Sequence, residues 1–202
     1  MNRFVLLPTL SLAALLMSCA HRNNLPTAFA ADYHPQLDKS DVIRTPTCAA
    51  LSGVETRNAL KNAVVGERTL ETRPMPVQTI SMRGNPGNWL SASVSEMLRQ
   101  SGLAANRAGA PRLKLSLSDV MIHENIYVNS GYDGRVTLDA SLEDASGKVC
   151  WSDRKSGVAK NYGNSGEAIN YQETVNHALD RAMMAILSDK GFQDAACGHC
   201  RP

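Results

Sequence analysis

The chain has 202 residues, and its 21 Lys and Arg nearly balance its 19 Asp and Glu, giving a formal net charge of +2. No stretch concentrates either sign of charge, which excludes the electrostatic footprint of a nucleic-acid-binding domain or of a polybasic membrane-binding surface. The length suits one domain of ordinary size with enough chain to bury a core.

The first residues are typical of an export signal. Arg3 is the basic residue of a short leading segment, and residues 4–17 form an uncharged apolar run of 14 residues that Pro8 interrupts. The run is shorter than the ~20 residues that span a bilayer, so it predicts a cleaved signal peptide and not a transmembrane helix.

The end of this run, Leu16-Met17-Ser18-Cys19, resembles the lipobox of bacterial lipoproteins, in which the cysteine becomes the lipid-bearing first residue. We therefore expect residues 1–18 to be a signal peptide and Cys19 to carry lipid that attaches the protein to a membrane. Ala20, in place of an Asp, favours the periplasmic face of the outer membrane of a Gram-negative bacterium. The alternative is an ordinary secreted protein that is cleaved after residues 28–30 (Ala-Phe-Ala).

Residues 20–46 show neither helical nor strand periodicity and contain Pro26, Pro35 and Pro46. This composition predicts that residues 19–46 are a lipidated N-terminus and flexible tether, with an average reach of roughly 25–30 Å. A single α+β domain is then expected over residues 47–190, followed by a loose tail over residues 191–202.

The first helix of the expected domain has clear boundaries. Asn85 is a good N-cap, Pro86 suits the first helical position, and Ser101-Gly102 ends the apolar stripe. Upstream of this helix, residues 48–55 and 75–82 are weaker strand candidates.

After this helix, the spacing of the apolar residues changes from the helical repeat of 3.6 residues to the two-residue repeat of a β-strand. Leu113, Leu115 and Leu117 alternate with polar residues, and the phase slips by one residue at Asp119 before Val120 continues it. Such a slip predicts a β-bulge within a strand.

A hairpin and a second helix complete the pattern. Apolar residues alternate over residues 136–142, a turn is expected at 144–147, and residues 148–152 return as the partner strand. Asn170 and Glu173 are arranged as a capping box before a broad apolar stripe that runs to Leu187. Alternation predicts one solvated and one buried sheet face. The expected fold is a two-layer α+β domain in the order β-β-α-β-β-β-α, with an antiparallel or mixed sheet of about four to five strands covered on one face by two helices.

Two groups of residues resemble the YajG-type family of bacterial envelope lipoproteins. Residues 55–58 (Glu-Thr-Arg-Asn), followed by 65–68 (Val-Gly-Glu-Arg), are similar to the acidic-x-Arg and Gly turn of that family. Residues 136–187 are similar to its long hairpin, here ending at 147–151, and to its last helix, here opening at 170–173. The resemblance implies a two-layer α+β domain at the inner face of the outer membrane, without a defined biochemical role.

Four cysteines remain once Cys19 is assigned to lipid. An even number in an exported chain predicts two disulfides, and four cysteines allow three connectivities. We favour Cys48–Cys150 together with Cys197–Cys200. The alternatives are that Cys48 pairs with one of the C-terminal cysteines or that Cys48 and Cys150 are separate buried thiols.

The sequence does not predict an enzyme. Residues 197–200 (Cys-Gly-His-Cys) also occur in the active sites of disulfide isomerases, but no helix follows them to stabilise a thiolate, and they supply only three of the four ligands of a closed zinc site. His123-Glu124 lacks a partner histidine at helical spacing. We therefore expect no catalytic residue, no metal site and no cofactor.

The best candidate for a partner surface is the connection over residues 123–134. It is long for a hairpin loop, and Tyr127 and Tyr132 could be aromatic anchors of an interface. The alternative is that the strands extend through it, with residues 129–131 as the turn.

Together these features predict a non-catalytic accessory or scaffold lipoprotein of the cell envelope that contacts an envelope protein, with no small-molecule ligand specified. The first alternative is a lipid- or transporter-associated binding lipoprotein, an auxiliary subunit of a lipid or lipopolysaccharide trafficking system. A more distant alternative is thiol-disulfide exchange by residues 197–200.

Overall fold

Three long antiparallel strands form the centre of the fold, in a computed structural model that describes residues 27–38, 40–70, 73–126 and 130–200. They are β7 (Arg112–Ile126), β8 (Ser130–Glu143) and β9 (Val149–Gly163). The apolar side chains of β7 and β8 alternate as predicted, and the register between these two strands shifts between Leu117 and Asp119. The predicted β-bulge is therefore confirmed at its predicted place.

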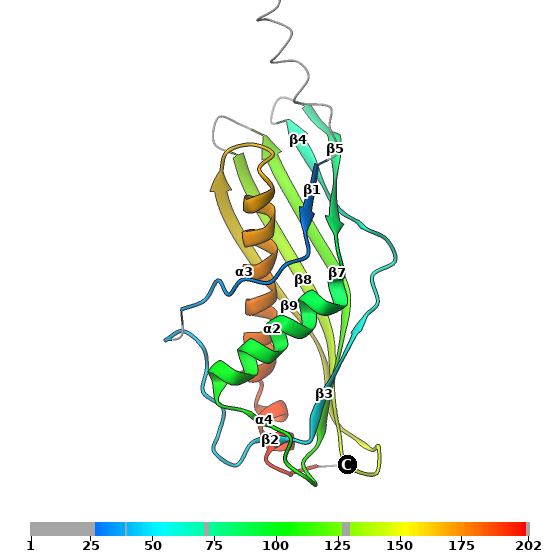
Figure 1. Cartoon of the computed structure of the whole chain (residues 1–202), viewed down its shortest axis with the longest axis vertical. Coiled ribbons are helices and arrows are strands. Elements are labelled where there is room, and N and C mark those ends of the chain that lie inside the picture. Colours follow the sequence, from blue (N-terminus) through cyan, green and yellow to red (C-terminus); the bar gives the residue numbers. More distant parts are fainter. Residues whose placement is uncertain (1–26, 39, 71–72, 127–129, 201–202) are drawn as a thin grey trace, which may run out of the picture.

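The sheet continues on the other side of β7, and this makes it larger than predicted (Figure 1). The parallel strands β3 (Gly53–Asn58) and β4 (Val64–Leu70) pair with opposite ends of β7. Beyond β4 come β5 (Arg73–Arg83), which is antiparallel, and β1 (Thr27–Ala30), which is parallel to β5. The result is a seven-stranded mixed sheet: six strands follow the order β1-β5-β4-β7-β8-β9, and the seventh, β3, pairs with β7 alongside β4. A separate two-stranded sheet consists of β2 (Ala50–Leu51) and β6 (Ala104–Ala105).

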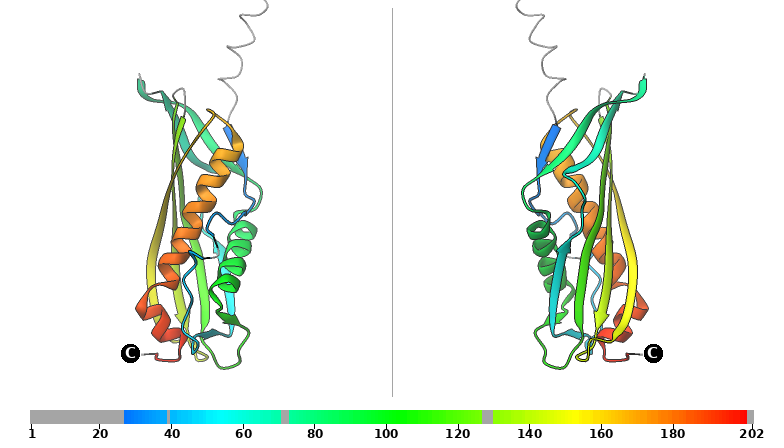
Figure 2. Two further views of the ribbon diagram at one scale, coloured as in Figure 1. Left: turned by 90° about the vertical axis from the view of Figure 1, so that its left-hand side faces the viewer. Right: turned by 90° about the vertical axis from the view of Figure 1, so that its right-hand side faces the viewer.

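The helices α2 (Pro86–Ser101), α3 (Ala168–Leu187) and α4 (Lys190–Ala196) pack against one face of this sheet (Figure 2). Helix α2 begins as predicted, because the Asn85 side chain accepts hydrogen bonds from the backbone N–H groups of Gly87 and Asn88. No helix of the described residues is long and apolar enough to cross a membrane. The coarse prediction of a mixed α+β fold is therefore confirmed, with a larger sheet and one more helix than expected.

The predicted capping box at the second helix is wrong. Helix α3 begins at Ala168, and its N-cap residue Glu167 makes no side-chain cap hydrogen bond. Asn170 lies inside the helix, where its amide donates to the Asn164 carbonyl oxygen at 3.0 Å, and the Glu173 carboxylate accepts from Asn161. Both residues fasten the preceding loop and strand instead of capping the helix.

The core fills the space between the sheet and the helices. Its largest side chains have 2% or less of their surface exposed; among them are Trp89, Leu90, Met97, Leu113, Leu115, Leu117, Tyr132 and Tyr171. Helix α3 approaches β9 so closely that a Cβ at Gly157 would lie 2.0 Å from the Ala178 carbonyl oxygen. Glycine at this position lets the helix lie directly on the strand.

The N-terminal segment departs from the predicted flexible tether over residues 19–46. Strand β1 belongs to the sheet, with Phe29 only 2% exposed. The Tyr33 hydroxyl donates to the Asp180 carboxylate at 2.7 Å, and the Gln36 backbone N–H donates to the same carboxylate at 2.8 Å. From residue 27 onward the predicted tether is therefore part of the folded domain.

The C-terminal segment also differs from the predicted loose tail over residues 191–202. Helix α4 occupies its first part, and the buried Phe192 ring packs edge-on against Trp151 with 5.4 Å between centroids. Cys197 and Cys200 are both bonded to distant parts of the chain. The C-terminal segment is therefore fixed to the domain as far as Cys200.

Candidate functional site

The face of the sheet turned away from the helices is the main candidate surface, and we call it the open face. It presents the outward side chains of β3, β7, β8 and β9, at the positions that alternate with the buried ones. Because the described helices all pack on the opposite face, these side chains meet solvent.

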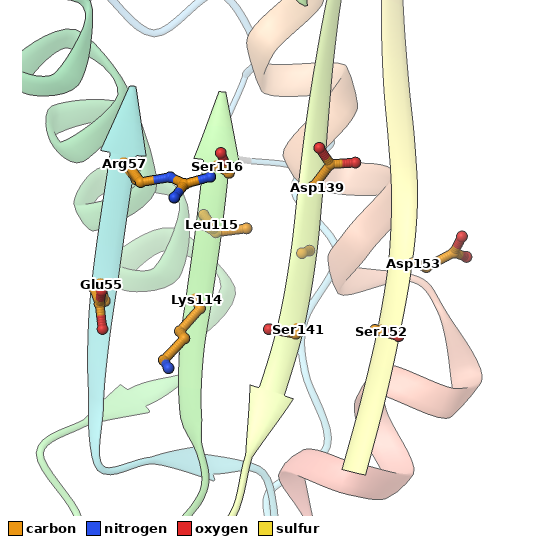
Figure 3. A pocket seen from close by; sticks show the side chains of 10 residues that line it. Glu55, Arg57, Lys114, Leu115, Ser116, Asp139, Ser141, Ser152 and Asp153 are labelled. Atoms are coloured by element: carbon orange, nitrogen blue, oxygen red, sulfur yellow. The ribbon is translucent and has the colours of Figure 1, made fainter. Parts of the chain in front are cut away.

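One half of the open face is polar (Figure 3). A shallow hollow of about 540 Å³ is lined here by Glu55, Arg57, Lys114, Ser116 and Asp139, among others. Glu55 and Arg57, which carry the acidic-x-Arg pattern, are exposed on this face.

Charged side chains of this face form ion pairs across neighbouring strands. Arg154 Nε lies 2.5 Å from Asp139 Oδ1, and Lys114 Nζ lies 2.7 Å from a carboxylate oxygen of Glu143. The hydrogen bond from Arg154 holds the pKa of Asp139 below its ordinary value. Asp139 is therefore held in its ionised form by an exposed partner, and the pair makes this part of the open face polar and charged.

The other half of the open face combines apolar and basic side chains. A hollow of about 620 Å³ there is lined by residues that include Met121, His123, Arg135, Val158 and Arg181. Met121 and Val158 expose 42% and 59% of their surface. Arg181 comes from α3 and donates to the Val158 carbonyl oxygen at 2.7 Å, so it covers part of the free edge of β9.

A buried charged cluster lies on the helix-covered side of the sheet. Glu124 is fully buried, and its carboxylate accepts from Arg68 Nε at 2.6 Å, Ser165 Oγ at 2.8 Å, the Gly166 backbone N–H at 3.0 Å and the Tyr171 hydroxyl. Burial alone would raise the pKa of Glu124, but the hydrogen bonds from Tyr171, Arg68 and Ser165 outweigh it and lower the pKa. With both oxygens occupied by protein donors, the cluster holds β4, β7 and α3 together.

Two disulfides close the opposite end of the molecule. Cys48 is bonded to Cys197 and Cys150 to Cys200, with Cα–Cα distances of 4.9 and 4.7 Å. Our preferred pairing is therefore wrong, and the alternative that Cys48 pairs with a C-terminal cysteine is correct. The two cysteines of residues 197–200 have different partners, so they are not the dithiol pair that exchange chemistry requires.

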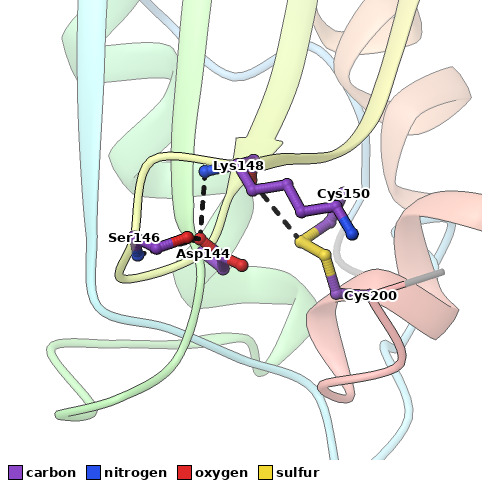
Figure 4. Close-up of a disulfide and its surroundings, with 5 residues drawn as sticks. All are labelled: Asp144, Ser146, Lys148, Cys150 and Cys200. Carbon is purple, nitrogen blue, oxygen red and sulfur yellow. Dashed lines mark hydrogen bonds between the residues drawn. A yellow bond between two sulfur atoms is a disulfide. The ribbon is translucent and has the colours of Figure 1, made fainter. Parts of the chain in front are cut away.

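The second bridge lies beside the turn after β8 (Figure 4). The Asp144 carboxylate accepts from the Ser146 hydroxyl at 2.6 Å and from the backbone N–H groups of Lys148 at 3.0 Å and Ser146 at 2.8 Å. The hydrogen bond from the Ser146 hydroxyl, followed by those from the backbone, lowers the pKa of Asp144. Asp144 lies near the sulfur atoms of Cys150 and Cys200, but these are bonded to each other and offer no thiolate to a metal.

The tyrosines predicted to form a partner surface do not do so as a pair. Tyr132 is 1% exposed, packs edge-on against Tyr171 and donates from its hydroxyl to the Asn164 carbonyl oxygen. This contradicts its predicted role, and strands β7 and β8 extend through the segment that we treated as a long loop. Tyr127 and Cys19 lie outside the described residues.

No protein-family model matches the chain, and no curated protein matches it. Among solved structures, protein XCC0632 of Xanthomonas campestris, of family DUF330, is similar with a TM-score of 0.44 and 14% identity, covering 80% of this chain and 92% of its own. A candidate lipoprotein of Caulobacter crescentus is similar with a TM-score of 0.39 and 19% identity, covering 68% of this chain and 92% of its own. These matches do not confirm the YajG-type resemblance.

Proposed function

We propose that this protein is an exported bacterial lipoprotein with a non-catalytic accessory or scaffold role in the cell envelope. Cys19 carries the lipid, and the domain lies at the periplasmic face of the outer membrane. The observation that carries the proposal is the pair of disulfides that join the segment before β2 and the start of β9 to the segment after α4. Such bridges persist in oxidising compartments outside the cytosol, which agrees with the export signal and lipobox.

The open face is the surface that we assign to an envelope protein partner. It places the exposed apolar side chains of Met121 and Val158 beside cross-strand ion pairs such as Arg135–Asp119, where the charged atoms are 3.4 Å apart. Protein interfaces combine an apolar centre with a polar rim in this way. Catalytic acids and bases, in contrast, are tuned by burial within a cleft.

The alternative of a lipid- or transporter-associated binding lipoprotein needs an apolar groove between the sheet and the helices. The side chains that line this space, Leu90, Met97 and Leu179 among them, are 0–1% exposed. They pack against one another as a core, which favours the accessory role over acyl-chain binding at this place.

Lipidation is tested by labelling cells with a palmitate analogue. We expect the wild-type protein to take up the label and the Cys19→Ala variant to take up none. Label in the variant would refute the anchor.

The partner surface is tested by placing a photo-crosslinking amino acid at Met121 or Val158 in intact cells, with exposed Ser91 on α2 as the matched control. We expect a discrete protein adduct from the two open-face positions, absent at Ser91 and lost on Arg135→Glu. Adducts of equal yield from the open face and from α2 would contradict the assignment.

A further inference from the structure

The chain enters the fold at one end of the long sheet. Thr27 opens β1, and its hydroxyl accepts a hydrogen bond from Arg68 Nη1 at 3.4 Å. Arg68 lies two residues before the end of β4, and its partner Glu124 lies two residues before the end of β7. We call this end, where β4, β7 and β9 stop and α3 begins, the entry end; it is uppermost in Figure 1.

The linker between lipid and fold is much shorter than a tether to residue 46 would be. Only residues 20–26 separate the lipid-bearing Cys19 from Thr27, the first residue of β1. Eight residue steps from Cys19 to Thr27 can span at most about 25–30 Å. Strands of the length of β8 and β9 span roughly 45–50 Å. The linker is therefore shorter than the sheet is long. With the strands perpendicular to the membrane, the end of the sheet opposite the entry end cannot face the membrane while Cys19 stays anchored in it.

Two side chains exposed at the entry end suit a lipid surface. Tyr162 is 72% exposed at the end of β9, and Ile169 is 49% exposed in the first turn of α3, on either side of the loop 164–167. The charges of Arg68 and Glu124 are buried and paired directly beneath. An exposed tyrosine beside an aliphatic side chain is the composition found at membrane–water interfaces.

The opposite end has a different character. The turn there carries Asp144 and exposed Ser146 and Lys148, and the two disulfides lie nearby. Charged and hydrogen-bonded groups of this kind stay in water. The far end also exposes Val149, by 49%, and the loop of the entry end carries exposed Glu167. The exposed aromatic ring of Tyr162 is what distinguishes the entry end, and it lies at the end of the sheet where the short linker requires the membrane to be.

We propose that the entry end faces the phospholipid surface and contacts it through Tyr162 and Ile169, so that the sheet stands away from the membrane with its disulfide end farthest out. This inference rests on the proposed lipidation of Cys19. It adds an orientation and a membrane-contacting surface that the anchor alone does not specify.

The test uses the full lipidated protein in phospholipid nanodiscs that contain a fraction of doxyl-labelled lipid. A dye is attached through a p-azidophenylalanine residue at Tyr162, at exposed Asn125 of the entry end, or at Ser146 of the far end as the control. We expect strong quenching at Tyr162 and Asn125 and none at Ser146. Equal quenching at both ends, quenching at Ser146 alone, or quenching at none of the three would overturn the orientation.

Mass spectrometry of the same samples separates this inference from the proposed function. A lipid-modified Cys19 with an unquenched entry end refutes the orientation while the lipoprotein assignment stands. An unmodified Cys19 refutes both.

The lipid contact has its own test. With the dye at Asn125, the Tyr162→Ser/Ile169→Ser variant is expected to lose a large part of the quenching, because both side chains are exposed and their replacement leaves the core intact. Unchanged quenching in a folded variant would show that the linker alone sets the distance and would overturn the contact. The Val158→Ser variant, on the open face, is the matched control and should quench as wild type.

Discussion

The buried cluster gives the sharpest test of what holds the fold together, through the variant Arg68→Met. Methionine keeps most of the volume of the arginine stem but removes the guanidinium that donates to Glu124 at 2.6 Å. The carboxylate, which is 0% exposed, is then left as an uncompensated buried charge. Removing one partner of such a pair typically costs about 3–5 kcal/mol, because the remaining charge has lost both its water and its counter-ion.

The assay is thermal unfolding of the purified protein in detergent, followed by circular dichroism. For a domain of this size a loss of about 3–5 kcal/mol lowers Tm by roughly 6–20 °C. The double variant Arg68→Met/Glu124→Gln removes both charges and should recover part of this loss. Arg154→Met breaks the exposed pair with Asp139 and serves as the control, with Tm expected to stay close to wild type. A Tm for Arg68→Met as high as that of the control would refute the reasoning.

The carboxylate of Glu124 also makes the stability of the fold depend on pH. Burial, which raises the pKa of Glu124, is outweighed by the hydrogen bonds from Tyr171, Arg68 and Ser165, so the folded-state pKa lies below the ordinary value of 4.5. The stability from this group is therefore full above pH 4.5 and is lost as the pH falls through the folded-state pKa. Buried Asp180, whose pKa is raised by burial, acts in the opposite direction. The readout is thus the difference between wild type and Glu124→Gln, which should shrink on acidification; a difference that grows would contradict the assignment.

Three further predictions concern stability and are measured by urea unfolding. Phe29→Ala should cost about 3–5 kcal/mol, because this side chain is buried in the core; a cost near zero would restore the flexible-tether interpretation. Gly157→Ala should destabilise by about 1–3 kcal/mol or more, since the new methyl group would meet the α3 backbone, whereas Gly53→Ala, with open space around it, should be nearly neutral; equal effects would argue against the close packing of α3 on β9. Cys150→Ala/Cys200→Ala should cost up to about 4 kcal/mol in the chain-entropy model, for a bridge that spans 50 residues, and an unchanged midpoint in the oxidised proteins would contradict the bridge.

The parts of the fold that the sequence predicts well are those whose signals are local. Asn85, Pro86 and Gly102 delimit α2 because caps act within a few residues of a helix end. The bulge near Asp119 is visible because alternation makes any shift of register apparent. The same alternation also identifies the outward positions that form the open face.

The parts that the sequence does not reveal depend on distant partners. Strand β4 carries no clear alternation, because Arg68 points into the core and is neutralised by Glu124, which is 56 residues away. Gly66 in the same strand suggests a turn, yet it is needed because a Cβ there would lie 1.8 Å from the Ile122 carbonyl oxygen. Strand β1 is only four residues long, and only its pairing with β5 makes it a strand. The connectivity of the disulfides cannot be predicted from the sequence for the same reason, because the spacing of cysteines does not specify which of them meet in the fold.

The connectivity of the two disulfides has a consequence for biogenesis. Each bridge joins an earlier cysteine, Cys48 or Cys150, to one that lies 149 or 50 residues further along the sequence, Cys197 or Cys200. In an exported chain that emerges from its N-terminus and whose Cys19 carries lipid, as proposed above, Cys48 and Cys150 meet the oxidant with only each other as partner. A premature Cys48–Cys150 bond must then be exchanged by attack of a C-terminal thiolate. Oxidative maturation therefore waits for Cys197 and Cys200 and, where such a bond has formed, for disulfide isomerisation. A product truncated before Cys197 has no route to the native disulfides.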